Sequence, residues 1–197
     1  MSALFQIFIA YLLGSIPFGL LLSHFAGVGD IRKIGSGNIG ATNVLRTGNK
    51  KLALLTLLLD GLKGTFAVLL ISHFDSSLIY IAGFAAILGH VFPIWLKFQG
   101  GKGVATVIGV YFSLNIPLAL MVVFIWVTVA KVWKISSLAA LVALALAPIF
   151  AFLLTLYNVS EFQIVYFSCI VTVLILYTHR QNIERLLSGQ ENSFKAE

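Results

Sequence analysis

The sequence is dominated by apolar stretches of about 20 residues, separated by short polar connections. A hydrocarbon core of about 30 Å needs about 20 apolar residues per helix, and the ten-residue alternation of a membrane barrel is absent from this sequence. Of the residues, 59% are hydrophobic and 10% charged, against about 45–50% and about 25% in soluble domains. A soluble globular domain is therefore excluded. We expect one membrane-embedded domain over residues 1–197, with a polar cytoplasmic tail at about 188–197.

Five stretches predict single helical spans, at residues 3–25, 52–72, 78–96, 137–156 and 161–178. The first has neither a basic start nor a small-residue cleavage site before a soluble body, so we do not interpret it as a signal peptide. The stretch 104–130 is too long for one untilted helix and too short for two full spans. Asn115 and Pro117 lie near its middle, and proline is favoured where a helix begins.

The basic residues decide how often 104–130 crosses. Apart from Lys63 they fall in four groups: Arg32, Lys33, Arg46, Lys50 and Lys51; Lys97 and Lys102; Lys131 and Lys134; Arg180, Arg185 and Lys195. The connections near 73–77, 115–117 and 157–160 carry none. Two crossings place all four groups on one face, which the positive-inside rule makes cytoplasmic. We therefore predict an all-α, polytopic integral membrane bundle of seven transmembrane helices, with the N-terminus outside and cytoplasmic loops forming the site.

A first polar cluster covers residues 30–51. Its glycines permit positive φ and close backbone approach, its neutral side chains offer hydrogen bonds, and Arg46 adds a fork of positive charge. These residues predict a phosphate cradle: Gly35, Gly37, Gly40, Ser36, Asn38, Thr42, Asn43 and Arg46. The alternative is a glycine-rich surface turn beside ordinary positive-inside residues. GSGNIG also fits the dinucleotide-binding pattern, but no strand precedes it.

A second cluster, residues 89–106, contains GGKG, which places Lys102 among Gly100, Gly101 and Gly103 at a predicted helix start. Free backbone N–H groups and the helix dipole favour an anion there. The segment is not a Walker A loop, because the required upstream glycine and the Ser or Thr after the lysine are missing. The alternative is that Lys102 is a snorkelling residue at the membrane boundary.

A third cluster, residues 178–191, begins where the last span reaches the cytoplasm. His179 and Asn182 are three residues apart and can face the same side of a helix. His179 can be a base, a hydrogen-bond donor or a cation at a helix end. Within the second span, Asp60 and Lys63 are also three apart, and mutual neutralisation is the favoured interpretation over a functional one.

The motifs together resemble the bacterial acyl-phosphate:glycerol-3-phosphate acyltransferases, the PlsY family. The resemblance covers nearly the whole chain and rests on YLLGSIPFG, GSGNIGATNVLR, LLLDGLKG, GHVFPIWLKFQGGKGVAT, the pair Ser136 and Ser137, and HRQNIERLLSGQE. One departure is Gln181, where the family commonly has glutamate; this argues against an acid or base role at that position.

The resemblance implies a multi-pass enzyme of the bacterial cytoplasmic (inner) membrane whose active site faces the cytoplasm. Its reaction transfers a fatty acyl group from acyl phosphate to the sn-1 hydroxyl of glycerol 3-phosphate, giving lysophosphatidic acid and phosphate in phospholipid synthesis. The family uses neither acyl-CoA nor acyl carrier protein. We expect no cofactor and no metal. Because the aromatic residues suit lipid-facing positions, we expect membrane lipids as the surroundings and no nucleic acid as a partner.

Carried over by motif, the expected catalytic residues are Ser36, Arg46, Lys102, His179 and Asn182. The expected substrate-binding residues are Gly35, Gly37, Asn38, Gly40, Thr42, Asn43, Gly100, Gly101 and Gly103. Arg46 and Lys102 are expected to bind phosphate, with Ser36 and the loop N–H groups completing the cradle.

Acyl phosphate has a good leaving group, so orientation and charge neutralisation can suffice without a covalent intermediate. Our hypothesis is that a substrate phosphate oxygen takes the proton of the attacking hydroxyl, with His179 and Asn182 as positioning groups. The alternative is His179 as general base. A different class, a small anion or lipid-phosphate transporter, also needs cationic glycine loops, and it predicts uptake without chemical change.

Overall fold

A computed structural model describes residues 1–193, which fold into α-helices and short 3-10 helices without any strand. The α-helices are α1 (Ala3–Gly14), α2 (Phe18–Phe25), α3 (Ala41–Leu45), α4 (Lys50–Phe74), α5 (Ile79–Val91), α6 (Val104–Leu114), α7 (Ile116–Trp133), α8 (Ser136–Leu156), α9 (Phe162–Thr178) and α10 (Arg180–Leu187). The 3-10 helices are η1 (Ile31–Lys33), η2 (Ser76–Leu78) and η3 (Ile94–Leu96). Residues 194–197 of the predicted polar tail lie outside the described part.

Five segments of the described chain are long and apolar enough to cross a membrane: Ala3–Phe25, Lys50–Phe74, Ser76–Leu96, Ile116–Trp133 and Ser136–Leu156. A sixth is reached when α9 and α10, which meet at a bend of 65°, are taken as one span. Helix α6 is apolar but has only 11 residues. The all-helical membrane class is confirmed at the level of five or six candidate spans, and the number seven stays a prediction.

The stretch 104–130 is broken where the sequence predicted. Helix α6 ends at Leu114 and α7 begins at Ile116. Asn115 caps α7, because its Oδ1 accepts a hydrogen bond from Leu118 N at 2.9 Å, and proline occupies the first turn. The division of this stretch into two helices is therefore confirmed.

The span predicted over residues 3–25 is confirmed as an apolar segment long enough to cross a membrane, but it consists of two helices. Helix α1 ends at Gly14 and α2 begins at Phe18. Pro17 is the cause, since it has no N–H to donate to the carbonyl one turn earlier. The break leaves the Ile16 carbonyl outside the helical ladder, and that carbonyl accepts a hydrogen bond from Lys63 Nζ at 2.8 Å.

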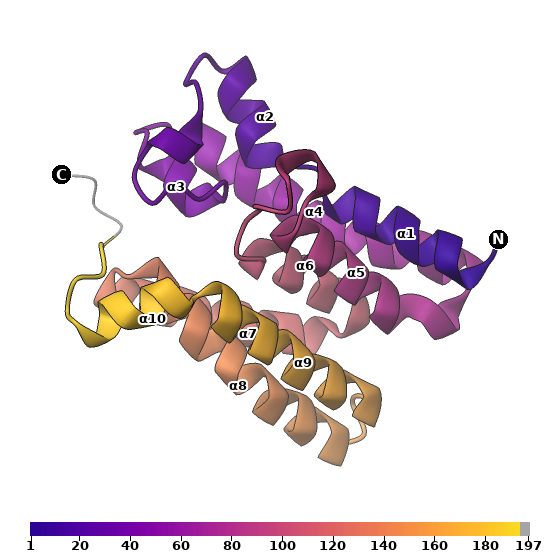
Figure 1. The fold of residues 1–197 in the computed structure, drawn as a ribbon. Helices are drawn as coiled ribbons and strands as arrows, with labels where there is room; N and C mark the ends of the chain where they lie inside the picture. Colours follow the sequence, from indigo (N-terminus) through magenta and orange to yellow (C-terminus); the bar gives the residue numbers. More distant parts are fainter. Residues whose placement is uncertain (194–197) are drawn as a thin grey trace. The chain divides into compact units, whose positions relative to one another are not determined.

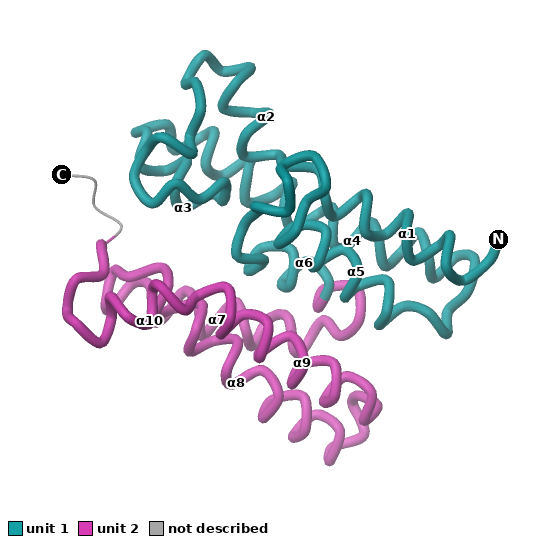
Figure 2. The backbone as a smooth tube through the Cα atoms, viewed as in Figure 1, with its two compact units in different colours: residues 1–110, 196–197 teal, residues 111–195 magenta. Residues whose placement is uncertain are grey.

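The chain forms two compact units, one of residues 1–110 and one beginning at Tyr111 (Figure 2). In the first unit α1 packs against α5 and α4, and α2 and α3 pack against α4 (Figure 1). In the second unit α8 lies between α7 and α9, and α10 follows α9 after the bend. Alanine and glycine occupy many of the buried helix positions, which lets the helices approach closely, as is typical of membrane helix packing.

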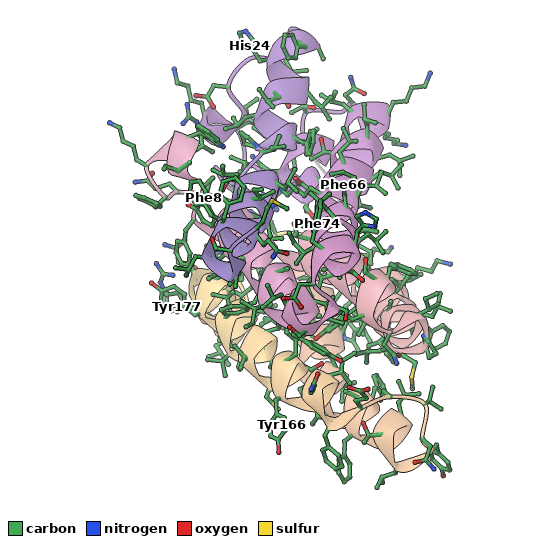
Figure 3. The ribbon with its side chains drawn as sticks, turned by 90° about the vertical axis from the view of Figure 1, so that its right-hand side faces the viewer. Phe8, His24, Phe66, Phe74, Tyr166 and Tyr177 are labelled. Carbon is green, nitrogen blue, oxygen red and sulfur yellow. The ribbon has the colours of Figure 1, made fainter. Side chains whose placement is uncertain are left out.

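Large apolar side chains cover the outside of the helices. Figure 3 shows Phe8, Phe66, Phe74, Tyr166 and Tyr177 pointing away from the backbone, and each is more than half exposed. Such exposure suits contact with lipid chains, whereas a water-exposed surface of this kind favours aggregation.

Candidate functional site

The first glycine loop, residues 34–40, is held in shape by Asn43 of α3. Asn43 Oδ1 accepts hydrogen bonds from Ser36 N at 3.0 Å and Ser36 Oγ at 3.3 Å, while its Nδ2 donates to Ile31 O at 2.8 Å. The residue is 2% exposed. The Asn43 amide therefore braces the loop from within, and its expected contact with substrate stays a prediction.

Arg46 lies against the same turn. Gly35 has φ +55°, and a Cβ there would lie 2.6 Å from Asn43 Oδ1 and 2.9 Å from Arg46 Cδ. Only glycine therefore leaves room for the arginine stem at this backbone conformation. Because Ser36 is exposed and Arg46 half-buried, the turn presents a hydroxyl and a guanidinium side by side.

The two arginines of this region differ in their charge partners. Arg32 Nη2 lies 2.7 Å from Asp30 Oδ2, and the hydrogen bonds from Arg32 lower the pKa of Asp30 to about 2. Arg46 has no carboxylate partner among residues 1–193. Arg46 is therefore the better candidate to bind an anion, since the charge of Arg32 is already neutralised.

The remaining predicted residues of this loop shape its backbone. Asn38 Oδ1 accepts a hydrogen bond from Gly40 N at 2.9 Å, and Gly37 has φ +70°. Thr42 lies in the first turn of α3, half-buried. Beneath the loop, a small apolar cluster formed by Ile31, Ile39, Val44, Leu52 and Ala53 also packs against Leu96 of η3. This contact joins the first glycine loop to the segment that leads to Lys102.

The Lys102 loop, residues 97–103, folds back on the end of α5. Gly100 N donates to Val91 O, and Gly101 N donates to His90 O, both at 3.0 Å. A Cβ on Gly100 would overlap the His90 carbonyl, and one on Gly101 would overlap the His90 ring. These two glycines are thus required by packing, because they bring the loop onto α5, and their expected contact with substrate stays a prediction.

Lys102 precedes the first turn of α6 by two residues, as predicted, and is half-buried. Gly103 has φ +92°, and its carbonyl accepts from Val107 N at 2.8 Å in the first turn of α6. The lysine therefore stands beside backbone N–H groups of a helix start, where an anion is favoured.

His179 lies at the bend between α9 and α10, in the second unit, and is 2% exposed. Its Nδ1 lies 2.9 Å from Ile175 O. A carbonyl oxygen can only accept, so this contact requires the proton on Nδ1 and leaves the lone pair of the neutral ring on Nε2. His179 is therefore a buried, oriented imidazole and differs from an ordinary boundary histidine.

Asn182 is fixed by a residue that the sequence pattern did not single out. Glu191 Oε1 accepts from Asn182 Nδ2 at 2.6 Å and from Ser137 Oγ at 2.7 Å, and its Oε2 accepts from Arg185 Nε at 2.6 Å. Burial raises the pKa of the Glu191 carboxyl, but these hydrogen bonds and the Arg185 charge outweigh it, so the net pKa lies below its usual value. The signal available beforehand was that Glu191 ends the third polar cluster and the motif HRQNIERLLSGQE, although the same residues were interpreted as the start of the tail. Gln181 is exposed on α10.

Asp60 and Lys63 form the predicted ion pair, with 2.8 Å between Lys63 Nζ and Asp60 Oδ1 and both side chains 3% exposed. The sequence did not predict that His90 joins them: its Nδ1 lies 3.6 Å from the same Asp60 oxygen. Within the described residues there is no group of three His, Cys, Asp or Glu side chains suited to a metal ion.

The first two clusters thus lie in the unit of residues 1–110, joined through Leu96, and the third lies in the other unit. Arginine, lysine, a serine hydroxyl and helix-start N–H groups are the donors that bind phosphate in proteins. The fold and these loops define a helical integral membrane protein built to handle phosphate-bearing molecules.

The chain belongs to the glycerol-3-phosphate acyltransferase family, whose family model matches residues 4–189. A glycerol-3-phosphate acyltransferase of Mesorhizobium japonicum is 54% identical over 186 residues, covering 94% of this chain and 93% of the relative. One of Rhizobium meliloti is 52% identical over 191 residues, covering 97% and 92%. The resemblance inferred from the motifs is therefore confirmed.

Solved structures agree with the fold. The crystal structure of PlsY, an integral membrane glycerol 3-phosphate acyltransferase, in its glycerol 3-phosphate form, is 39% identical with a TM-score of 0.88, covering 99% of this chain and 96% of that one. Its lysophosphatidic acid form gives a TM-score of 0.87 at the same identity, covering 100% and 97%.

Proposed function

We propose that this protein transfers a fatty acyl group from acyl phosphate to the sn-1 hydroxyl of glycerol 3-phosphate. The products are lysophosphatidic acid and inorganic phosphate, and the reaction belongs to phospholipid synthesis. The observation that carries the proposal is the likeness, over 99–100% of the chain, to an acyltransferase solved with glycerol 3-phosphate and with lysophosphatidic acid. The donor follows from the same family membership.

Arg46 and Lys102 bind substrate phosphate in this proposal. Support comes from the absence of a carboxylate partner for Arg46 among residues 1–193 and from the place of Lys102 at a helix start. Ser36 and the N–H groups of the first glycine loop complete the cradle. Asn43 holds the first glycine loop in shape, and Gly100 and Gly101 hold the Lys102 loop against α5.

The chemical step is a direct acyl transfer. The glycerol hydroxyl oxygen forms a bond to the acyl carbon, the bond from that carbon to the phosphate oxygen breaks, and the hydroxyl proton ends on the released phosphate. Cationic groups around the leaving phosphate stabilise the developing charge. The step as written requires no carboxylate of the protein.

His179 and Asn182 position the hydroxyl and the phosphates. The proton on His179 Nδ1 directs the lone pair of the neutral ring to Nε2, which suits acceptance of a hydrogen bond from a substrate hydroxyl. The Glu191 contact fixes the direction of the Asn182 amide. His179 and Asn182 are the residues that the second unit contributes to the proposed reaction.

We place the protein in the bacterial inner membrane with seven crossings, the N-terminus outside and the site in the cytoplasm. The helix bounds support this orientation, because apart from Lys63 the Lys and Arg residues of the described chain lie at or beyond helix ends. In the first unit they gather where α4 begins and after α5 ends, and in the second where α7 ends and where α9 meets α10. The short helix α6 and α7 supply the paired crossings of residues 104–130.

The test is an assay of detergent-purified protein with palmitoyl phosphate and glycerol 3-phosphate. The proposal expects inorganic phosphate and lysophosphatidic acid to form together, and only when both substrates are present. Without a closed membrane no gradient exists, so a transporter shows neither product. Substrate uptake into proteoliposomes without chemical change would contradict the proposal and favour the transporter.

A further inference from the structure

A cluster of three ionisable side chains is buried inside the first unit. Asp60 is 2% exposed, and Lys63 and His90 are each 5% exposed. Taking a charge out of water costs several kcal/mol, and replacing a buried ion pair by apolar residues is often neutral or stabilising. Packing alone is therefore a poor reason for such a cluster, and ionisable groups within membrane spans are functional candidates.

The three side chains have different neighbours. Lys63 Nζ lies 2.8 Å from Asp60 Oδ1 and donates to Ile16 O at the break between α1 and α2. His90 Nδ1 faces the same Asp60 oxygen at 3.6 Å and has no hydrogen-bond partner among the described residues. Lys63 thus supplies the counter-charge and stabilises the break, while Asp60 and His90 face each other.

His90 connects this cluster to the Lys102 loop. One edge of its ring, Nδ1, is turned to Asp60, and the other edge, around Nε2, lies against Gly101 so closely that a Cβ on Gly101 would overlap it. The His90 carbonyl also accepts from Gly101 N at 3.0 Å. The imidazole is therefore a spacer between Asp60 and the residue that precedes Lys102.

The chain after Lys102 is fixed to the same turn of α4. Thr106 Oγ1 donates to Asp60 O at 2.9 Å, and Thr65 Oγ1 donates to Gly109 O at 2.8 Å. A Cβ on Gly64 would lie 2.6 Å from Thr106 O, so α6 and α4 are in close contact here. The segment before Lys102 is thus held by the end of α5, and the segment after it by α4 at and just beyond Asp60.

We propose that Asp60 and His90, with Lys63 as counter-charge, form a positioning cluster for the Lys102 loop. The cluster sets where the Lys102 ammonium stands and thereby the binding of the substrate phosphate that it contacts. None of the three touches substrate. The inference rests on the proposed function, because it assigns the cluster a role in the same reaction.

The experiment is a double-mutant cycle with His90→Ala and Lys102→Ala, measured as phosphate release with each substrate varied in turn. Lys102→Ala identifies the substrate whose KM depends on the lysine. We expect His90→Ala to raise the KM for that same substrate about tenfold or more, with kcat changed less than about threefold, and to cause no further rise in the Lys102→Ala background. The matched control is His73→Ala, which removes an exposed histidine in the last turn of α4. This substitution should leave both KM and kcat unchanged.

A second variant tests the spacer without touching the buried charges. Gly101→Ala should raise the same KM, because its methyl group displaces the ring, and adding His90→Ala should not worsen it, because the ring is then gone. Gly101→Ala by itself keeps the test decisive should His90→Ala unfold, because an unchanged KM would then overturn the positioning role.

The outcomes are distinguishable. KM effects of His90→Ala that add fully to those of Lys102→Ala, or a fall in thermal stability with unchanged KM, would overturn the positioning role and leave the proposed function intact. A wild-type protein that releases no phosphate would contradict the proposed function itself.

Discussion

Replacing Glu191 by alanine removes the acceptor that joins the beginning of α8 to α10 and fixes Asn182. The carboxylate accepts hydrogen bonds from Ser137, Asn182 and Arg185 at 2.6–2.7 Å, and its side chain is 7% exposed. The first two donors are buried, whereas the Arg185 side chain is 36% exposed. The loss is therefore mainly that of two buried hydrogen bonds to a charged group.

The magnitude follows from these contacts. A hydrogen bond to a charged group contributes about 1.5–3 kcal/mol, so two of them contribute about 3–5 kcal/mol after allowance for non-additivity. The exposed Arg185 pair adds at most about 1 kcal/mol. We expect Glu191→Ala to lower the free energy of unfolding by about 4 kcal/mol and Tm by roughly 8–16 °C, taking about 2–4 °C per kcal/mol for a chain of this length.

The assay is thermal unfolding of detergent-purified protein, followed by the fluorescence of its three tryptophans, of which Trp126 and Trp133 lie in α7. Glu184→Ala is the control, since that side chain is exposed on α10. The stabilisation by Glu191 also depends on pH. The pKa of Glu191 lies below its usual value of 4.5, so its contribution is present above that value and declines as the pH falls through the pKa of the folded state. A Glu191→Ala protein that melts within about 2 °C of Glu184→Ala at pH 7 refutes the magnitude, because a single kcal/mol already shifts Tm by about that much.

Three further substitutions test the site. Arg46→Ala should lower kcat/KM about 10²-fold or more in the phosphate-release assay and Arg46→Lys nearly as much, whereas Arg32→Ala, which removes an ion pair on the surface, should leave kcat/KM nearly unchanged. His179→Gln should cost only about tenfold in rate if the residue positions substrate; a fall beyond roughly 10³-fold with loss of the acidic limb of the pH profile would assign it the role of general base. Gly35→Ala should reduce activity in a protein that still folds, because the new methyl group would lie 2.6 Å from Asn43 Oδ1 at φ +55°; wild-type kcat/KM would show that the turn is not part of the site.

The membrane class and most of the helix positions could be predicted from the sequence. Spans depend on local composition, since about 20 apolar residues are needed wherever a helix crosses a bilayer. The helix break at Asn115 could also be predicted from neighbouring residues, because a capping side chain and a proline lie together there. Pro17 carries the same kind of signal, but apolar residues on both sides concealed it.

The contacts that shape the candidate site were less accessible to sequence reasoning. His90 and Asp60 are thirty positions apart on different helices, so no spacing rule pairs them. Asn43 was expected to contact substrate, and its hydrogen bonds within the loop were not predicted. An asparagine beside glycines suits either role, so the sequence does not distinguish them. Glu191 lies in a polar segment whose composition suggested a solvated tail, and only the turn after α10 returns it to Ser137.

The bend of 65° at His179 has a kinetic consequence under the proposed reaction. The bend separates the apolar helix α9 from the polar helix α10, and in the orientation proposed above this places the imidazole near the head group of a lipid-like donor. The donor then reaches the enzyme by lateral diffusion in the lipid or detergent phase. Turnover should follow the mole fraction of acyl phosphate in the mixed micelle, and diluting the sample with donor-free detergent should slow the reaction even at constant bulk concentration.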